Sequence, residues 1–449
     1  MEKAMMQWPA LLSAGRLGDP KVRTPDPARS HFQVDGDRII FSSAFRRLQD
    51  KTQVHPLAEN DYVRTRLTHS LEVASVGRSL GARVGAALVA RHGLEQHSLH
   101  ASDFGAVVHA AALAHDLGNP PFGHSGEDSI RHWFQHAPAA KPFREETTDD
   151  AHADFASFEG NAQGFRIVTR LQMPDNPGLR LTFATLGAFT KYPRASIGQP
   201  GGHTGASIKK FGFFQSEAPL FAEVAEHCGL LPRGRQCWAR HPLAFLVEAA
   251  DDICYRLVDF EDGYRLGYLS YDQVAESFLS VTGDPKDRDR AARMADQKNQ
   301  VAFLRAQAIG TAVGQTAQAF LDREDALLRG EFDEPLLDHI ASAAELNAIK
   351  KASIATIYNT PRGVAIELRG HSIITRLLDT FASAVEDVTR HGKSASPRSR
   401  KLLLLVPEQF IGPGRTPAPD AYTRLLRLTD FVSGMTDSYA VKLAETIGA

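Results

Sequence analysis

The chain has 449 residues, of which 43% are hydrophobic and 23% charged, and its formal net charge is −2. This length suits one large domain or two to three ordinary ones, and the composition is that of a globular protein. Near-neutral charge argues against a dedicated nucleic-acid wrapper. The three cysteines lack the dense, even pattern of a disulfide scaffold, and no run of about 18 apolar residues suits a membrane span. We therefore expect a cytoplasmic protein that does not cross a membrane.

Residues 1–36 are expected to form an extended N-terminal arm, because Pro, Arg and Asp are frequent in GDPKVRTPDPARS. After this arm the spacing becomes helical, since Ile40, Ala44 and Leu48 are four apart and share one face. Two long apolar helices follow, in RLTHSLEVASVGRSLGARVGAALVARHG and in DFGAVVHAAALAHDLG. The second is expected to end at Gly118, before a Pro-Pro pair.

A third helix is predicted to begin near Ser125, with Asp128 as its capping partner. Residues 137–157 are polar and acidic and predict a loop. Residues 193–209 are rich in Gly and Pro and predict an exposed, mobile loop. Helical spacing dominates elsewhere and alternating strand patterns are few, so the fold class predicted is all-α.

The polar pair His115 and Asp116 ends a helix that is otherwise built of Ala, Val and Leu. Buried polar groups need partners, and either hydrogen bonds at the helix end or a metal ion would supply them. On its own, His69 in RLTHSLEV is more typical of a hydrogen-bonded core histidine.

The helix predicted over 245–260 carries two adjacent aspartates. At about 100° per residue, Asp251 falls at the edge of the apolar arc, whereas Asp252 is rotated further out and can pair with Arg256. A solvated acidic face therefore explains Asp252 better than Asp251. Together, two imidazoles and two carboxylates, from His69, His115, Asp116 and Asp251, suit a divalent metal ion, foremost Mn²⁺ or Mg²⁺, with Co²⁺, Ni²⁺ or Fe²⁺ as alternatives.

The order of these four residues resembles the HD-domain metal phosphohydrolases. The match extends to one family among them, the deoxyguanosine triphosphate triphosphohydrolases, through SSAFRRLQDKTQV, RTRLTHSLEV, HDLGNPPFGHSGE, FEGNAQGFR, TKYP and EAADDICYRLVDFED. These segments run from about Ser42 to Asp262, and NTPRGVAIEL in the C-terminal half is a looser match. The resemblance implies a helical-bundle catalytic domain of the HD type over 37–270. A helical region over 271–449 would complete the substrate pocket and contribute an oligomer interface.

The resemblance also implies roles for single residues. His69, His115, Asp116 and Asp251 match the metal ligands, His124 the catalytic histidine, and Glu127 the carboxylate that orients it. Imidazole titrates near neutral pH and suits proton transfer, although Glu127 would also simply complement a positive helix start. The positions that match substrate contacts are Gln53, Arg66, Asn161, Lys191, Tyr192, Lys210, Tyr255 and Asp259, with Arg362 from the C-terminal region. Arg66, Lys191 and Lys210 are expected at the phosphates and Gln53, Tyr255 and Asp259 at the deoxyribose, although the two lysines alone would be assigned to the solvated surface.

The implied activity is hydrolysis of a deoxynucleoside triphosphate (dNTP) to deoxynucleoside and intact triphosphate. Two other classes stay open: another HD-type phosphohydrolase, such as a 5′-nucleotidase or a cyclic-dinucleotide phosphodiesterase, and a weakly active sensor that binds nucleotides or single-stranded DNA. The resemblance further implies a homo-hexamer regulated by a dNTP or by single-stranded DNA. The preferred base is left open, and the Gly-rich segment 197–205 is interpreted as a lid, an allosteric element or a disordered loop.

Overall fold

The computed structural model describes residues 4–19, 21, 24, 26, 28–53, 64–173, 178–358 and 360–448, except for the side chain of Arg362. The prediction of an all-α fold is confirmed, because the described residues contain helices and one two-stranded antiparallel sheet.

The N-terminal half contains the central pair of helices, α4 and α5, against which α2 and α10 of this half pack, together with α12 (Pro242–Arg265) and α15 (Gln297–Asp322) of the C-terminal half. The helices of the N-terminal half are α1 Trp8–Leu11, α2 His31–Ile40, α3 Ser43–Arg47, α4 Arg66–His92, α5 Ala101–Ala114, α6 His124–His136, α7 Lys141–Glu146, α8 Asp149–Ala156, α9 Gly160–Arg166, α10 Phe183–Phe189 and α11 Ala218–Cys228. The strands β1 Pro232–Gly234 and β2 Cys237–Trp238 follow.

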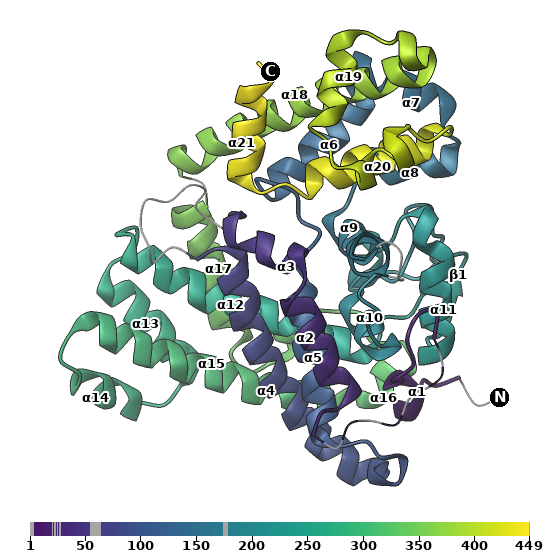
Figure 1. The fold of residues 1–449 in the computed structure, drawn as a ribbon. Coiled ribbons are helices and arrows are strands. Elements are labelled where there is room, and N and C mark those ends of the chain that lie inside the picture. Colours follow the sequence, from purple (N-terminus) through teal and green to yellow (C-terminus); the bar gives the residue numbers. More distant parts are fainter. Residues whose placement is uncertain are drawn as a thin grey trace.

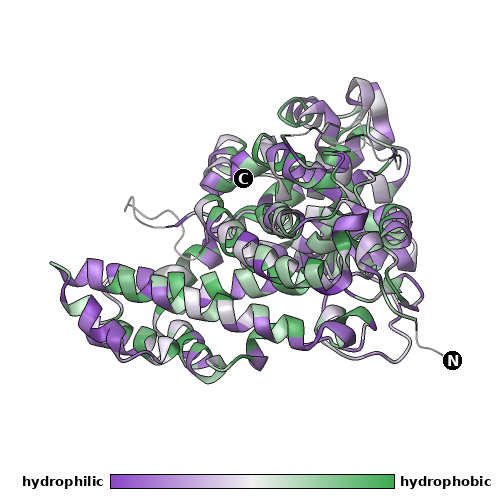
Figure 2. Ribbon diagram, turned by 90° about the horizontal axis from the view of Figure 1, so that it is seen from below, coloured by the Kyte–Doolittle hydropathy of each residue, from purple (hydrophilic) through white to green (hydrophobic). Residues whose placement is uncertain are grey.

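The C-terminal half is also helical. Its helices are α12 Pro242–Arg265, α13 Tyr271–Thr282, α14 Lys286–Ala292, α15 Gln297–Asp322, α16 Glu324–Leu328, α17 Ala343–Ser353, α18 Pro361–His391, α19 Pro397–Leu404, α20 Ala421–Ser433 and α21 Asp437–Thr446. Helices α13, α14 and α15 form the extension at the left of Figures 1 and 2.

Two hydrophobic clusters make up the core. One contains α4, α5, α10 and α12, and the other joins α6–α8 to α18–α21, which form the upper part of the molecule in Figure 1. Because α6–α8 pack with the C-terminal helices, the division of the core does not coincide with the predicted boundary at residue 270. The turn between α5 and α6 lies where the two clusters meet, since Leu117 belongs to the first cluster and Phe122 to the second.

Glycines bring α4 and α5 unusually close. A Cβ on Gly81 would lie 2.6 Å from the carbonyl oxygen of Phe104, and one on Gly85 would lie 2.9 Å from that of Ala101. Any larger side chain at these positions would separate the helices. Helix α4 is also the one described helix that is long and apolar enough in composition to cross a membrane. Its buried face packs in the core, and its first turn carries Arg66 and His69 into the site, so it is a core helix.

The expectation of an extended arm is wrong for the described part of this segment. Trp8 and Leu11 are buried, and the Trp8 indole N–H donates to Glu324 Oε1 at 2.8 Å. Helix α2 begins at His31, where Ser30 forms a capping box with Gln33. The polar composition of this segment led to the prediction of an arm. The prediction fails because a few buried apolar side chains are enough to pack the segment against the core.

Three further local predictions are wrong. The helical face over 40–48 is interrupted, since α2 ends at Ile40 and Ser42 caps a new helix, α3. Helix α6 begins at His124 with Gly123 as its N-cap, and the Ser125 hydroxyl donates instead to the Glu367 carbonyl at 3.0 Å. Residues 137–157 contain the short helices α7 and α8 rather than a loop, because their few aromatic residues are buried.

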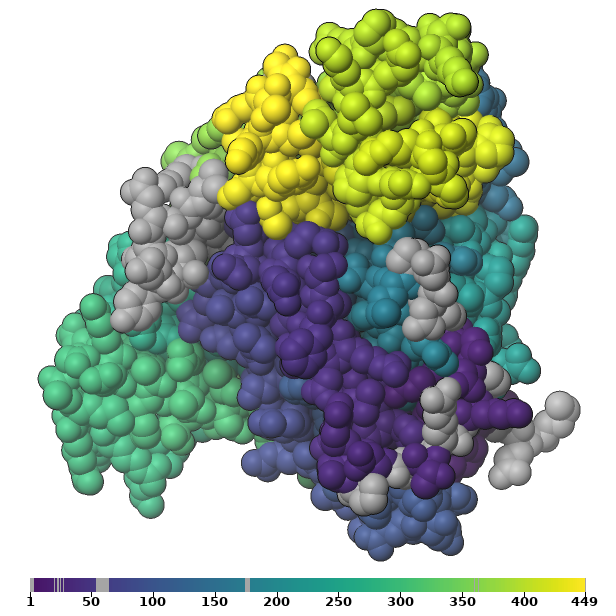
Figure 3. Space-filling view, in the orientation of Figure 1, coloured from purple at the N-terminus to yellow at the C-terminus, as the bar shows by residue number. Residues whose placement is uncertain are grey.

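The C-terminal helix lies against the N-terminal part of the chain, as the contact between the yellow and purple surfaces in Figure 3 shows. Both carboxylate oxygens of the buried Asp437, the first residue of α21, accept hydrogen bonds: Oδ1 from the Phe122 backbone N–H at 3.0 Å and Oδ2 from the Thr52 backbone N–H at 3.0 Å. The Thr52 hydroxyl also donates to Oδ2. A residue near the C-terminus therefore positions the turn that leads into His124.

Candidate active site

Four predicted metal ligands converge from three parts of the chain. One ligand atom each of His69, His115 and Asp116 lies within 4.8 Å of the other two. His69 Nε2 lies 3.0 Å from Asp251 Oδ1, and His115 Nε2 lies 3.6 Å from that same oxygen and 3.6 Å from Asp116 Oδ2. The first turn of α4, the end of α5 and the middle of α12 thus supply one compact set of ligands.

The hydrogen bonds around His115 show that these residues fit a cation. Its Nδ1–H donates to the Ala112 carbonyl at 2.7 Å, which leaves Nε2 as a lone-pair acceptor. Nε2 is buried, has no hydrogen-bond partner among the described residues, and faces the carboxylate oxygens of Asp116 and Asp251. Arg66 donates to Asp116 Oδ2 and His69 Nε2 lies 3.0 Å from Asp251 Oδ1, but no described residue is hydrogen-bonded to His115 Nε2. A positive centre between this nitrogen and the two carboxylates would supply the missing partner. Imidazole and carboxylate ligands together match a divalent metal.

Both carboxylates are held in the ionised form that a metal requires. Burial alone would raise the pKa of Asp116, but Arg66 and the two histidines outweigh it and lower the pKa to about 2. Asp251 behaves alike: burial opposes ionisation, yet His115 and His69 lower its pKa. The predicted pairing of Asp252 is confirmed, since Arg256 donates to it at 3.0 Å.

Arg66 lies one turn before His69 and is buried beside the cluster. Its Nη1 donates to Asp116 Oδ2 at 2.8 Å. Gly123 has a φ of 60°, a backbone conformation that strains other residues, and a Cβ there would lie 2.8 Å from Arg66 Nη2. Glycine therefore permits this turn and the close approach of the guanidinium to it. Arg66 thus couples the metal site to the turn before His124.

His124 is the first residue of α6 and is exposed to the cavity. It follows a strained turn, in which Phe122 has a φ of 61° although it is not glycine. The predicted contact with Glu127 is not formed: Glu127 Oε1 instead accepts the Gly160 backbone N–H at 2.7 Å, and Oε2 lies 3.4 Å from Arg131. His124 makes no hydrogen bond with the described residues, which leaves it available to a bound molecule.

Two lysines from the predicted phosphate side lie in the cavity, each next to a carboxylate. Lys191 Nζ is 3.2 Å from Glu248, and Lys210 Nζ is 3.0 Å from Glu159. Burial opposes their charge, but neighbouring carboxylates, chiefly Glu248 for Lys191 and Glu127 for Lys210, raise both pKa values. Both lysines are therefore cationic at neutral pH.

An aromatic part of the cavity wall is formed by Tyr255, whose ring stacks on Tyr358 with centroids 5.1 Å apart and planes 11° from parallel. The Tyr358 hydroxyl donates to Asp259 Oδ2 at 2.9 Å, so Asp259 lies behind the wall rather than in the cavity lining. Burial raises the pKa of Asp259 to about 6. Tyr358 ends a π-helical turn over 354–358, a distortion that is frequent at functional sites.

The cavity that contains these residues has a volume of about 670 Å³. The predicted site residues that line it are Gln53, Arg66, His69, His115, Asp116, His124, Glu127, Asn161, Lys191, Tyr192, Lys210, Asp251 and Tyr255. Asp259 lies outside the lining, and the Arg362 side chain lies outside the described part of the structure.

Sequence reasoning missed several lining residues, among them Asn119, Glu248, Lys350, Tyr358 and Glu367. Asn119 stands inside the HDLGNPP motif, and its amide donates to Asp116, so motif position was a signal. No feature of the sequence pointed to Lys350, which lies on α17. Unlike Arg66, Lys191 and Lys210, it makes no ion pair with any described residue.

The Gly-rich loop is fixed at its base. Arg194 donates to the carbonyls of Ser196 and Ile208 at 3.1 and 3.0 Å, and the Ser207 backbone N–H donates to Asp333 at 3.1 Å. Residues 201–204 at its tip are exposed, but Ala195, Ala206 and Ser207 are buried, so the predicted exposure of 193–209 holds only for the tip.

A model of the HD domain matches residues 66–156, which contain three of the four ligands. The chain is 44% identical to the deoxyguanosinetriphosphate triphosphohydrolase-like protein of Synechocystis sp., over 98% of this chain and 99% of that protein. A protein of the same description from Pseudomonas aeruginosa is 43% identical over 98% of both chains. The deoxyguanosinetriphosphate triphosphohydrolase of Klebsiella pneumoniae is 30% identical over 94% of both.

The chain belongs to the deoxyguanosinetriphosphate triphosphohydrolase family. Membership and the HD domain make it a phosphohydrolase of the HD class. The cluster of His69, His115 and Asp116 indicates a divalent metal in this class of site.

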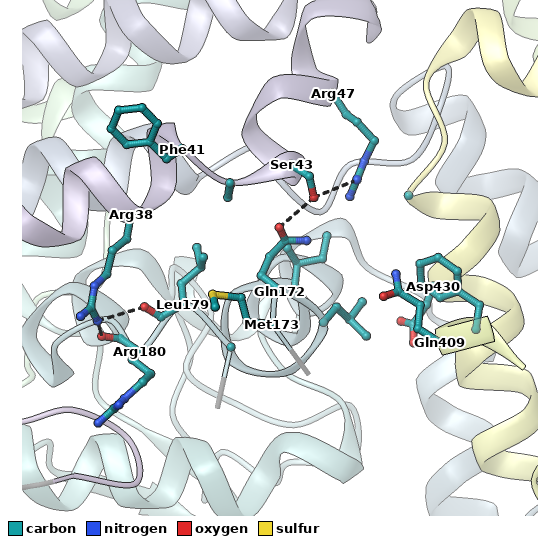
Figure 4. Close-up of a pocket in the computed structure, with 16 residues that line it drawn as sticks. Arg38, Phe41, Ser43, Arg47, Gln172, Met173, Leu179, Arg180, Gln409 and Asp430 are labelled. Atoms are coloured by element: carbon teal, nitrogen blue, oxygen red, sulfur yellow. Dashed lines mark hydrogen bonds between the residues drawn. The ribbon is translucent and has the colours of Figure 1, made fainter. Parts of the chain in front are cut away.

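A second cavity, of about 630 Å³, lies between α2–α3, the residues after α9 and the C-terminal helices (Figure 4). Arg38, Arg47 and Arg180 line it, together with the largely exposed Phe41 and Met173. Arg38 donates to the Leu179 carbonyl at 3.2 Å, and Arg47 donates to the Ser43 hydroxyl at 3.3 Å. The cavity combines cationic and apolar surface.

Proposed function

We propose that the protein hydrolyses deoxynucleoside triphosphates to deoxynucleoside and inorganic triphosphate. The observation that carries this proposal is a single cavity in which a His/Asp cluster lies with Lys191 and Lys210 and a stacked pair of tyrosines. Metal ligands suit phosphoryl chemistry, cations suit a polyphosphate and an aromatic wall suits a sugar face. The name of the relative from Klebsiella pneumoniae supports the same substrate class.

In the proposed reaction a water oxygen bonds to the α-phosphorus, the bond from phosphorus to the 5′-oxygen breaks, and that oxygen takes a proton. A divalent ion held by His69, His115, Asp116 and Asp251, with Mn²⁺ or Mg²⁺ expected, supplies Lewis-acid activation. Lys191 and Lys210 hold the phosphate chain and offset its negative charge. His124, free of hydrogen bonds to described residues, transfers the proton. Tyr255 packs against the deoxyribose, where a 2′-hydroxyl would be crowded.

The alternatives are less well supported. A monophosphate substrate does not need two lysines beyond the metal cluster, and a pure sensor does not need an exposed histidine beside it. Incubation with each dNTP, NTP and dNMP in the presence of Mn²⁺, followed by identification of the phosphate product, separates them. Triphosphate supports the proposal, orthophosphate or pyrophosphate indicates another phosphohydrolase, and tight binding without product indicates a sensor.

The role of His124 has its own test. We expect His124→Ala to reduce triphosphate release by about 10²–10⁴-fold, the usual contribution of a general acid or base, while metal content stays unchanged. His97→Ala, an exposed histidine outside the cavity, is the matched control. Unchanged turnover in His124→Ala would remove this residue from the mechanism.

We further propose regulation by a nucleotide, assembly into a homo-hexamer and a cytoplasmic location. The cavity in Figure 4 supports the first, because arginines bind phosphate and Phe41 offers a face on which a base can stack. Binding of each dNTP to the Arg47→Ala variant and sedimentation analysis with and without dNTP test the first two proposals. Single-stranded DNA is the alternative regulator in the same assay.

A further inference from the structure

A group of three histidines lies outside the cavity, where α6 packs against α18. His132 and His136 are four residues apart on the exposed side of α6, and His371 lies on the neighbouring helix. The His132 ring centroid is 4.6 Å from that of His136 and 5.5 Å from that of His371. None of the three makes a hydrogen bond or ion pair with a described residue, so no contact in the fold explains the cluster.

The helix backbones that carry the three rings are held in place. The Ser125 hydroxyl donates to the Glu367 carbonyl at 3.0 Å, and the Trp133 indole N–H donates to Asp379 at 2.8 Å. These two hydrogen bonds join α6 to α18 on either side of His371 along α18, and on α6 Trp133 directly follows His132. Buried side chains such as Ile130 fill the space between the two helices. The approach of His371 to His132 is therefore a stable feature of the packing.

The spacing suits coordination of one ion. With Zn–N bonds of about 2.1 Å and a tetrahedral angle, two imidazoles on the same ion have ring centres about 5 Å apart. The two measured separations, 4.6 and 5.5 Å, lie on either side of this value. His136 and His371 are not in ring contact, so the three nitrogens converge only after these side chains rotate. His136 is exposed and His371 is half-buried, and exposed side chains rotate within picoseconds to nanoseconds.

We propose that His132, His136 and His371 form a second metal site. This site is distinct from the cluster of His69, His115, Asp116 and Asp251, which is called the HD cluster below. Three imidazoles without a carboxylate select Zn²⁺, Ni²⁺ or Cu²⁺ over the hard ions Mg²⁺ and Mn²⁺. The bound ion would cross-link α6 to α18 and leave one coordination position to water. The site stands apart from the proposed triphosphohydrolase reaction, because its residues do not line the cavity.

Zn²⁺ binding to the full-length, EDTA-treated protein tests the proposal, measured by calorimetry at pH 7.5 in excess Mg²⁺. We expect two sites in the wild type. His132→Gln should weaken one of them at least about tenfold, since even the loss of a supporting residue costs that much affinity. His97→Gln, a distant exposed histidine, should bind as the wild type does.

A second variant assigns the sites. His115→Gln removes a ligand of the HD cluster and should leave the three-histidine site intact, so one equivalent of Zn²⁺ still binds and is lost on adding His132→Gln. Triphosphate release by His132→Gln should equal that of the wild type, which separates failure of this proposal from failure of the proposed function. Equal Zn²⁺ stoichiometry and affinity in the wild type and His132→Gln would overturn the proposal of a three-histidine metal site.

Discussion

Asp437 offers a sharp test of how the C-terminal helix supports the active site. It is 1% exposed and accepts the backbone N–H groups of Thr52 and Phe122. We predict that Asp437→Ala destabilises the protein and lowers triphosphate release together. No other described group accepts a hydrogen bond from these two N–H groups, so the substitution leaves both of them without a partner.

The magnitude follows from those two groups. A buried donor without a partner costs about 1–3 kcal/mol, so the buried Phe122 N–H and the part-buried Thr52 N–H together cost at most about 6 kcal/mol. Removing the carboxylate also removes the cost of burying its charge, which offsets part of the loss. We therefore expect the free energy of unfolding to fall by about 3 kcal/mol. Activity should fall as well, because Phe122 lies two residues before His124.

Guanidinium unfolding, followed by circular dichroism, measures the change, and triphosphate release is assayed on the same samples. Ser438→Ala is the matched control: this neighbour on α21 donates an exposed hydrogen bond to Asp50 at 2.8 Å, and its loss should cost less than about 1 kcal/mol. The reasoning is refuted if Asp437→Ala stays within about 1 kcal/mol of the wild type, or if Ser438→Ala destabilises equally.

Three further predictions address pH, substrate and metal. Burial raises the pKa of Asp154 from 3.8 to about 7. Between these two pH values the carboxyl keeps its proton in the folded protein but has lost it in the unfolded chain. The free energy of unfolding should therefore fall by about 4 kcal/mol as the pH rises from about 4 to about 7. Denaturation of Asp154→Asn at pH 4, 5.5 and 7.5 should lack that slope, and an identical slope would contradict the assignment. Lys350→Ala should raise the KM for dNTP about tenfold, because a lysine without an ion pair can bind phosphate without losing another partner, whereas the exposed Lys351→Ala should not; steady-state kinetics decides. Asp251→Asn should lose bound Mn²⁺ while Asp252→Asn retains it, and equal metal content by mass spectrometry would count against the ligand set.

The sequence predicts best where one local rule dominates. Helical rotation correctly predicts that Asp252 pairs with Arg256, while Asp251 lies beside His69. It does not predict exposure, because both aspartates are partly buried and both line the cavity. The same logic fails for Glu127: its spacing from His124 suggests a pair, but the backbone of Gly160, 33 residues away, takes the carboxylate instead. Lys350 gave no signal, because its place in the cavity depends on how α17 packs.

The N-terminal segment and residues 137–157 show a related limit. Both are mainly polar, and composition alone predicts that they do not pack. Trp8 in the first and Phe155 in the second are nonetheless buried. The burial of two or three large side chains in a complementary pocket can order a segment whose average composition is polar. That pocket is formed by residues distant in the sequence, so composition alone does not predict it.

The close approach of α4 and α5 has a consequence for how metal preference can change in this protein. His69 lies on α4 and His115 follows α5, so the distance between the two imidazoles depends on a contact made by backbone atoms at Gly81 and Gly85. Where backbone atoms are in contact, changes in side-chain packing cannot alter the distance between the two helices, as they can at an interface made by side chains. With the proposed ligands, any adjustment to a metal of different radius is therefore expected from the carboxylates, and above all from Asp251, which reaches the site from a third helix.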